Sequence, residues 1–195
     1  MNGRKHDNYI ITTQNGLQVR VRRLQSDDVP YLLEIFEQMS SNSRYHRFNQ
    51  AVDNVSEEMK LREAERIAGS DLLRGEGLIA FADMPEMPDV TIGAARYVCV
   101  GDGVAEAAMS VIDAVQKQGI GTELMLMLTE LAKAYGVRQL IADVRNDNEA
   151  IRTILHRMPY EVRWVRDGMF SQVFVDLTRP KLQEQNERGV STAVS

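Results

Sequence analysis

Two features of the sequence have residue types and spacing suited to chemistry: a glycine-containing turn and an isolated acidic residue. Gly119 and Gly121 lie two positions apart, between an expected strand and an expected long helix. Glycine lets the backbone turn tightly and approach a ligand without obstruction by a Cβ atom. At the start of a helix successive N–H groups converge, and the helix dipole favours an anion. We therefore expect a phosphate-bearing ligand at this turn.

The two best-known phosphate-binding patterns do not describe the turn. A P-loop requires Gly-x-x-x-x-Gly-Lys-Ser/Thr, and a dinucleotide-binding fingerprint requires Gly-x-Gly-x-x-Gly. Here Gly119-Ile120-Gly121 is followed by Thr122-Glu123-Leu124, which fits neither pattern. A bare Gly-x-Gly turn could also be a simple corner between a strand and a helix.

The isolated acid is Glu106, which stands alone among small and apolar residues in the strand expected over Ala105–Ile112. Val111 lies five positions further on, which is roughly 16 Å along a strand that rises about 3.3 Å per residue. A lone carboxylate at such a place is a candidate general acid or base for proton transfer. We expect Glu106 to be partly buried among apolar neighbours, as suits a catalytic base. The alternative is an acid at an exposed strand end.

The elements that must position these residues follow a definite order. Strands are expected over 9–13, 17–24, 78–82, 91–100, 105–112, 139–144, 161–166 and 170–177, and helices over 27–39, 56–69, 121–135 and 146–159. Asn15-Gly16 and Asp167-Gly168 are typical of hairpin turns. Ser26, Ser56 and Asn146 are the expected helix caps, with Glu149 at capping-box spacing. The order ββ-αα-βββ-α-β-α-ββ predicts an α/β or α+β fold with a mixed sheet covered by helices.

Composition excludes several classes of function. The chain has 195 residues, 44% of them hydrophobic and 26% charged, as in an ordinary globular protein. The longest strongly apolar run, Leu124–Leu128, is too short to span a membrane. A net charge of −5 argues against a nucleic-acid partner. One cysteine and three scattered histidines argue against a metal site. We expect a cytoplasmic protein without metal, nucleic-acid or membrane partners.

The stretch Gln116–Gly121 matches the pattern Q/R-x-x-G-x-G/A, and here the chain resembles the GNAT superfamily of N-acetyltransferases. Asn148-Glu149-Ala150-Ile151, followed by Pro159-Tyr160, is similar to the second signature of that family. The family usually has Gly-Phe where this chain has Pro-Tyr. The resemblance covers roughly residues 9–177. It implies the GNAT acyl-CoA N-acyltransferase fold over residues 9–180, with flexible termini over 1–8 and 181–195.

The resemblance also implies acetyl-CoA as co-substrate and a role for each matching residue. The loop would bind the pyrophosphate through backbone N–H groups, and Val111 and Ile112 would pair with the pantetheine arm. Asn148 would contact the arm or would serve only as a helix cap. The implied acetyl-CoA site comprises Val111, Ile112, Gln116, Lys117, Gln118, Gly119, Ile120, Gly121, Thr122 and Asn148.

A narrower resemblance connects the chain to the Pat-type bacterial protein lysine acetyltransferases. Ala105-Glu106-Ala107-Ala108 is similar to the start of the strand that carries their catalytic glutamate. Ser43–Phe48, which reads Ser-Arg-Tyr-His-Arg-Phe, resembles their helical segment beside the acceptor site. Arg44 and Tyr45 are therefore candidate substrate-binding residues. Alternatively this segment packs Tyr45 and Phe48 into the core, and either Arg44 or Arg47 faces the cleft.

These features predict direct transfer of an acetyl group from acetyl-CoA to a primary amine. A protein lysine is the expected acceptor and Glu106 the general base; a homodimer is a further expectation. No general acid is assigned, because Leu155 occupies the position where many GNAT enzymes have a tyrosine. Two alternatives stay open: N-acetylation of a small amine such as a polyamine, and a non-catalytic acyl-CoA sensor.

Overall fold

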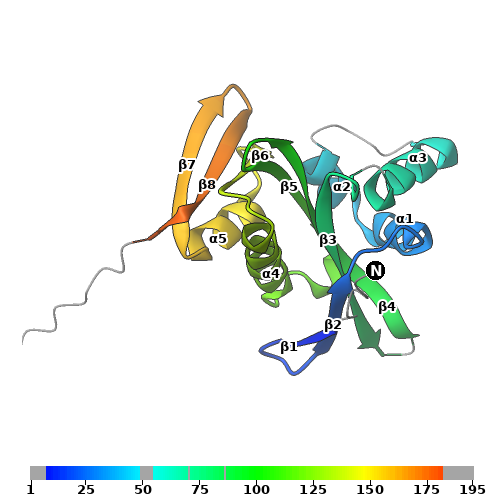
Figure 1. Cartoon of the computed structure of the whole chain (residues 1–195). Coiled ribbons are helices and arrows are strands. Elements are labelled where there is room, and N and C mark those ends of the chain that lie inside the picture. Colours follow the sequence, from blue (N-terminus) through cyan, green and yellow to red (C-terminus); the bar gives the residue numbers. More distant parts are fainter. Residues whose placement is uncertain (1–7, 49–54, 70, 86, 182–195) are drawn as a thin grey trace, which may run out of the picture.

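A computed structural model describes residues 8–48, 55–69, 71–85 and 87–181. In these residues eight strands form one sheet in the order β1-β2-β3-β4-β5-β6-β8-β7 (Figure 1). The strands are β1 Tyr9–Thr12, β2 Gln18–Arg23, β3 Gly75–Met84, β4 Met87–Gly101, β5 Val104–Val111, β6 Gln139–Arg145, β7 Tyr160–Asp167 and β8 Phe170–Pro180. The termini that were expected to be flexible lie outside the described residues, apart from Asn8 and Lys181.

Antiparallel pairing dominates the sheet, and β5 with β6 is its parallel pair in the described part of the chain. Parallel neighbours need a long crossover connection, which here is the helix α4, Ile120–Ala134. The predicted hairpins are confirmed: β1 and β2 meet across Gly16, which has φ +86°, and β7 and β8 meet across Gly168, which has φ +55°. The expected mixed sheet covered by helices is therefore correct.

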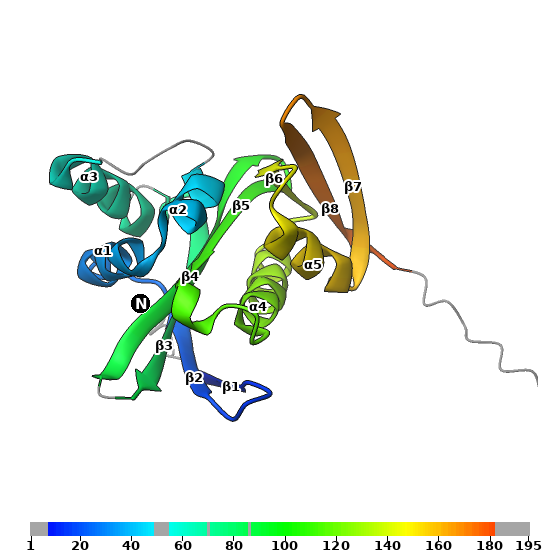
Figure 2. The same ribbon diagram turned by 180° about the vertical axis from the view of Figure 1, so that it is seen from behind.

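Helices cover both faces of the sheet. The first group is α1 Val29–Gln38, α2 Ser41–Phe48 and α3 Glu57–Ala68; the second is α4 and α5 Glu149–Arg157. Figure 2 shows the first group on one side of β4 and β5, and α4 and α5 on the other. Within the described residues, no helix is long and apolar enough to cross a membrane.

Several predicted helix boundaries are confirmed and two are wrong. Ser56 caps α3 by accepting a hydrogen bond from the Met59 N–H. The first helix begins at Val29 rather than at Asp27, and Asp28 is its N-cap. The Asp28 carboxylate binds the Arg22 guanidinium at 2.7 Å, which holds this residue outside the helix. Asn146 does not cap α5.

The residue that caps α5 is Asn148, whose Oδ1 accepts from the Ile151 N–H at 3.2 Å. The side chain of Asn146 instead binds Ser171, 2.6 Å away, and the Gly168 carbonyl, which ties the start of the helix to the last hairpin. The predicted element order did not include α2, which the structure shows between α1 and α3.

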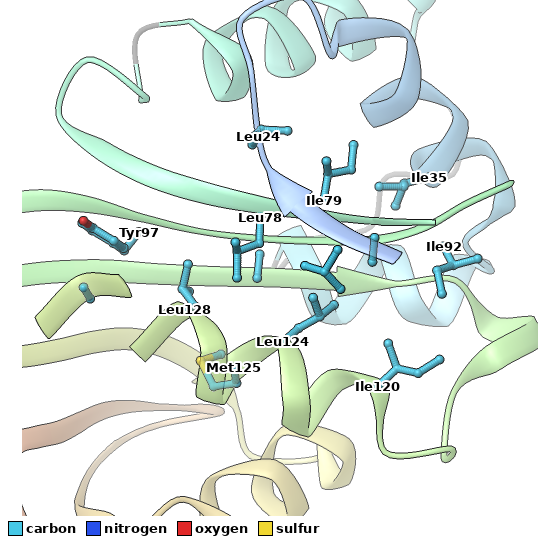
Figure 3. Packing of buried hydrophobic residues seen from close by; sticks show 14 of the residues in the cluster. Leu24, Ile35, Leu78, Ile79, Ile92, Tyr97, Ile120, Leu124, Met125 and Leu128 are labelled. Carbon is cyan, nitrogen blue, oxygen red and sulfur yellow. The ribbon is translucent and has the colours of Figure 1, made fainter. Parts of the chain in front are cut away.

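The core fills both sides of the sheet. Figure 3 shows Leu124 and Leu128 of α4 packing beneath the strands and Ile35 of α1 lying above them. Leu124 and Leu128 are fully buried. Burial of this kind is worth roughly 1.5–3 kcal/mol for each large side chain, so it fixes α4 against the strands that lead into and out of it. The spacing of apolar residues over 56–69 predicts Met59 on the inner face of that helix, but Met59 is 59% exposed, so this prediction is wrong.

Candidate active site

The parallel strands β5 and β6 pair only at their beginnings. Their register pairs are Val104 with Gln139, Ala105 with Leu140 and Glu106 with Ile141. Beyond Glu106, β5 stays paired with β4 as far as Val111, and β6 stays paired with β8 as far as Arg145. The two strands therefore diverge and leave a V-shaped gap, with facing backbone edges that have no strand between them in the described part of the chain.

Backbone hydrogen bonds decide which groups face this gap. The Ile112 N–H donates to the Ile92 carbonyl on β4 at 3.0 Å, and the Ile112 carbonyl accepts from Val115. Because the backbone groups of successive residues in a strand point to opposite edges, the N–H and carbonyl of Val111 point into the gap. Of the two residues expected to pair with a pantetheine arm, Val111 directs its N–H into the gap, while its carbonyl already accepts from Gln116 Nε2 and both backbone groups of Ile112 are engaged within the protein.

The loop between β5 and α4 presents backbone N–H groups. After the short 3₁₀ turn Asp113–Val115, Lys117 has φ +62°, and Gly119, with φ +89°, is the N-cap of α4. In the described chain, no hydrogen bond uses the N–H groups from Lys117 through Thr122. The first N–H groups of a helix have no partner inside the helix, and together with the dipole they form an anion site. The loop thus has the donors that a pyrophosphate requires.

Side chains of the loop hold its shape. The Gln116 amide Nε2 donates to the Val111 carbonyl at 2.9 Å and to Ser43 Oγ at 3.1 Å. Gln118 Oε1 accepts from the Asn15 side chain at 3.0 Å. The predicted loop residues Gln116 and Gln118 therefore position the backbone donors, whereas the side chain of Lys117 is exposed.

Asp113 anchors α2 to the same loop. Its carboxylate accepts from the N–H and hydroxyl of Ser40 and from the hydroxyl of Ser43, at 2.7–2.9 Å. Although burial acts in the opposite direction, these hydrogen bonds lower the pKa of Asp113 below its ordinary value. A stable carboxylate at this point joins the helices above the sheet to the expected phosphate site.

Gly121 allows α4 to lie close to its neighbours. A Cβ atom there would stand 3.0 Å from Cδ1 of Ile154 on α5 and 3.3 Å from Cε of Met109 on β5. Asn148, at the start of α5, is half-buried and forms the helix cap. Its Nδ2 atom makes no hydrogen bond in the described part of the chain, so the cap leaves a donor for a contact with the arm.

Glu106 stands at the point where β5 and β6 separate. Its side chain is exposed, so the expected partial burial is wrong. Strands flank the backbone of Glu106 on both sides, through Val98 on β4 and Ile141 on β6, so its side chain is exposed on the face of the sheet. Glu106 lies opposite Val98 on β4, and Ala108 lies opposite Arg96. Alternation along the strands places these four residues on the face covered by α1, α2 and α3.

A pocket of about 400 Å³ lies on that face. Its floor is formed by β4 and β5 and its walls by α1, α2 and α3. Apolar side chains make most of the walls, among them Leu32, Ile35, Phe36, Met39, Phe48 and Ile67. A pocket of this size, with few polar groups, is typical of a site for a small molecule or a single side chain.

Charged groups gather at one end of the pocket. Asp71 binds Arg96 at 2.8 Å and Arg66 at 2.7 Å, and Arg66 also binds Glu63 at 2.6 Å. Burial, and after it the charge of Arg96, lower the pKa of Arg47 to about 10. Sequence reasoning missed Arg96 and Asp71. The signal was present, since Arg96 is the one charged residue in the otherwise uncharged stretch Thr91–Val98.

Neither Arg44 nor Tyr45 lines this pocket. Arg44 donates from its Nε to the Phe36 carbonyl at 3.1 Å and so caps the end of α1. The guanidinium of Arg145, the last residue of β6, lies over the ring of Tyr45, with 4.1 Å between Arg145 Cζ and the ring centre. Of the two arginines that could face the cleft, Arg47 does so.

Helix α2 spans the mouth of the V-shaped gap. At its start, Ser43 contacts Gln116 in the loop after β5. Further along, Tyr45 stacks on Arg145, and His46 Nε2 lies 3.4 Å from the Asp147 carboxylate after β6. The helix therefore ties together the two diverging arms of the sheet.

The sheet thus splits between two parallel strands beside a helix start with unused N–H groups, an arrangement that suits an extended ligand with a phosphate at one end. Residues 18–160 match the profile of the acetyltransferase (GNAT) domain. The chain belongs to the GNAT family and is an N-acetyltransferase that moves an acetyl group from acetyl-CoA to an amine. The acyl-CoA sensor, a non-catalytic alternative, is therefore wrong. A search of curated protein sequences returned no match.

Solved structures share this fold. The GNAT domain of S. lividans PAT is 24% identical, with a TM-score of 0.72 over 87% of this chain and 96% of that chain. The PaiA N-acetyltransferase from Thermoplasma acidophilum, in complex with coenzyme A, is 18% identical, with a TM-score of 0.60 over 81% of this chain and 98% of that one.

A cAMP-binding acyltransferase from Mycobacterium smegmatis is 26% identical, with a TM-score of 0.54. The match covers 88% of this chain but 48% of that protein. This chain therefore corresponds to about half of the mycobacterial protein.

Proposed function

We propose that this enzyme acetylates lysine side chains of proteins, with Glu106 as the general base. One observation carries the proposal: Glu106 forms the last register pair between β5 and β6, and its exposed side chain lies on the face that holds the pocket. A carboxylate at the base of the gap stands between the cavity for an acceptor and the space for a thioester.

The V-shaped gap and the loop after β5 form the proposed acetyl-CoA site. The pyrophosphate binds the N–H groups of the loop, and the pantetheine arm lies along the free edge of β5, where it bonds to Val111. Asn148 approaches the arm from the start of α5. The unused N–H groups of Lys117–Thr122 and the separation of the strands support this assignment.

Acyl transfer then proceeds in one step from thioester to amide. Glu106 takes a proton from the acceptor ammonium, directly or through water, and the neutral amine attacks the thioester carbonyl carbon. The C–N bond forms and the C–S bond breaks, with the electron pair leaving on sulfur. The attacking nitrogen gives up its second proton to the departing thiolate, so coenzyme A leaves as the thiol and the product is a neutral amide. Because a thiol has an ordinary pKa near 8.5, this leaving group needs little help from a general acid.

Two similarities support a protein acceptor: the Ala-Glu-x-Ala start of β5 and the Ser43–Phe48 segment both resemble Pat-type enzymes. The exposure of Glu106 also leaves room for a side chain that reaches in from a larger partner. A small amine, such as a polyamine, is the second candidate, favoured by the mostly apolar pocket of about 400 Å³. The homodimer remains a prediction.

Mapping of acetylated sites across a proteome tests the protein acceptor. Cells that produce the wild-type enzyme should show new acetyl-lysine sites that are lost with Glu106→Gln. If acetylation appears only on small amines, the protein acceptor is wrong while the base assignment stands. If the Glu106→Gln enzyme acetylates the same sites at the same rate, Glu106 is not the base.

A further inference from the structure

Two arginines in the pocket are incompletely paired. Arg96 is 7% exposed, and its Nε atom is buried without a hydrogen-bond partner. Its Nη1 atom binds Asp71 at 2.8 Å, so a single carboxylate holds one side of the guanidinium. The half-buried Arg47 has no carboxylate within ion-pair distance in the described part of the chain; its contact there is with the Phe48 ring, 5.1 Å away.

The other charged residues that line the pocket have partners. Lys60 pairs with Glu57, Arg62 with Glu58, and Arg66 with both Glu63 and Asp71. The Arg62–Glu58 pair is exposed, whereas the Lys60 side chain is mostly buried and lies over the Phe36 ring. Among the described charged residues of the pocket, Arg47 and Arg96 are therefore the ones with hydrogen-bond donors left for a ligand.

A buried cation without a partner is costly, because it has lost its hydration and gained nothing in exchange. Such a group calls for an explanation in a folded protein. Arginine presents its donors in a planar fork that matches a carboxylate, and pairs of this kind are among the stronger hydrogen bonds in proteins. The chemistry of this end of the pocket thus fits a planar anion.

The geometry relates this anion site to the proposed base. Arg96 lies opposite Ala108 and Val98 opposite Glu106, so Arg96 and Glu106 are diagonal neighbours across β4 and β5. Diagonal neighbours have Cα atoms about 7–8 Å apart. An acceptor could therefore place its amine at Glu106 and a negatively charged group at the arginines.

We propose that Arg47 and Arg96 bind a carboxylate carried by the acceptor, so that the enzyme selects amines that have a carboxylate nearby and an apolar body. The apolar walls, with Leu32, Ile35 and Phe36, contact the body of the acceptor. The proposal deepens the proposed function and rests on it, because the amine is taken to lie at Glu106. Two sources share this chemistry: an acidic residue beside the acceptor lysine of a protein, and a free amino acid.

Binding can be measured without turnover by using N-acetyl-leucine, whose amine is already acetylated, and N-acetyl-leucine amide, which lacks the carboxylate. N-acetyl-leucine should raise the melting temperature of the wild-type enzyme, and the amide should not. In Arg47→Met the response to N-acetyl-leucine should be lost, and in Arg47→Lys part of it should return. Arg20→Met, which removes an arginine of β2 that lies outside the pocket and pairs with Asp83 and Asp89, is the matched control and should respond as the wild type does.

Equal binding of N-acetyl-leucine and its amide, or an undiminished response in Arg47→Met, would overturn the proposal. Because these measurements need no acetyl transfer, they are independent of Glu106. If Glu106→Gln keeps full activity, the proposed base is wrong, but the carboxylate site is still judged by the binding experiment.

Turnover separates the two sources. Lysine peptides with a neighbouring glutamate are compared with the same peptides carrying glutamine, and free leucine is compared with leucine amide. If the acceptor is a protein, the glutamate peptide should have a KM roughly tenfold or more below that of the glutamine peptide; if it is a free amino acid, leucine should have a lower KM than leucine amide by the same factor, as a charge-assisted hydrogen bond predicts. Arg47→Met should abolish the difference. If neither pair shows a preference for the carboxylate, the proposal fails.

Discussion

Glu106 on β5 and Ile141 on β6 are the last residues that the two parallel strands hold in register. One position further on, the strands part, each kept in place by an antiparallel partner on its outer side. The acid is therefore fixed at the vertex of a gap rather than on a mobile loop. A functional group on a strand is held more accurately than one on a loop, which suits a base that must meet a thioester and an amine together.

The first prediction concerns that acid. Glu106→Gln should lower kcat about 10²–10⁴-fold, the usual contribution of a general base, because the acceptor then arrives with its proton still bound. The KM for acetyl-CoA should stay unchanged, since the loop and the free strand edge are untouched. Steady-state kinetics measure both, with Glu161→Gln on β7 as a control that should behave as the wild type does. A loss confined to acetyl-CoA affinity would contradict the assignment.

The second prediction compares two glycines with the same kind of backbone strain. Gly119 has φ +89° and Gly168 has φ +55°, and at both positions a Cβ atom would meet no other atom within 4 Å. Gly119→Ala and Gly168→Ala should each lower the free energy of unfolding by about 1–2 kcal/mol, the cost of a left-handed conformation for a residue with a Cβ atom.

Only Gly119→Ala should also weaken coenzyme A binding, because the strain disturbs the N–H groups at the start of α4. Calorimetric titration with coenzyme A and urea unfolding of both variants provide the measurements. Equal coenzyme A affinity in the two variants would remove the support for the loop as the pyrophosphate site.

The third prediction concerns how much the burial of the Arg47 charge lowers the free energy of unfolding. Burial and the neighbouring Arg96 lower its pKa to about 10 in the folded protein, below the ordinary value of an arginine in the unfolded chain. Between these two values the unfolded chain binds more protons, so this group makes stability rise with pH there. At pH 7 both states are protonated, and the full cost of burying the charge is present.

Arg47→Met should therefore raise the free energy of unfolding at pH 7, by an amount on the order of 1–3 kcal/mol given that one pKa unit corresponds to about 1.36 kcal/mol. The gain should shrink above about pH 10. Urea unfolding across this pH range measures it. A variant that is more stable yet no longer binds a carboxylate would show that the charge is kept for binding, whereas a destabilised variant would contradict this prediction.

The fourth prediction concerns the ion pairs beneath the pocket. Asp71 is 7% exposed and binds both Arg66 and Arg96, so Asp71→Asn should lower the free energy of unfolding by about 3–5 kcal/mol, as when one partner of a buried pair is removed. Glu58→Gln, which breaks the exposed pair with Arg62, should cost no more than about 0.5 kcal/mol. Thermal or urea unfolding measures both, and equal losses would contradict a buried role for Asp71.

Local sequence signals gave much of the fold. Asn15-Gly16 and Asp167-Gly168 correctly predicted the two hairpins, because a tight turn with positive φ needs glycine. Ser56 correctly predicted the start of α3. Asn146 gave a false capping signal because its partner, Ser171, is 25 positions away in the sequence and the spacing rule sees only neighbouring residues.

Long-range contacts likewise decided the candidate site residues. From the sequence, Arg44 and Arg47 are equivalent members of one segment. In the folded chain, Arg44 caps α1 through the Phe36 carbonyl, while Arg47 faces the pocket. Tyr45 turns away to stack on Arg145, a hundred positions further along the chain.

The sequence by itself determined the family, the glycine-containing turn before α4 and the identity of the isolated acid, because each is encoded within a few consecutive residues whose backbone requirements are local. Only the tertiary structure decided that Glu106 is exposed, that β5 and β6 part immediately after it, and that Arg96 and Asp71 meet beneath the pocket. These features arise from pairing between segments far apart in the chain, where the packing of whole strands and helices outweighs any local preference.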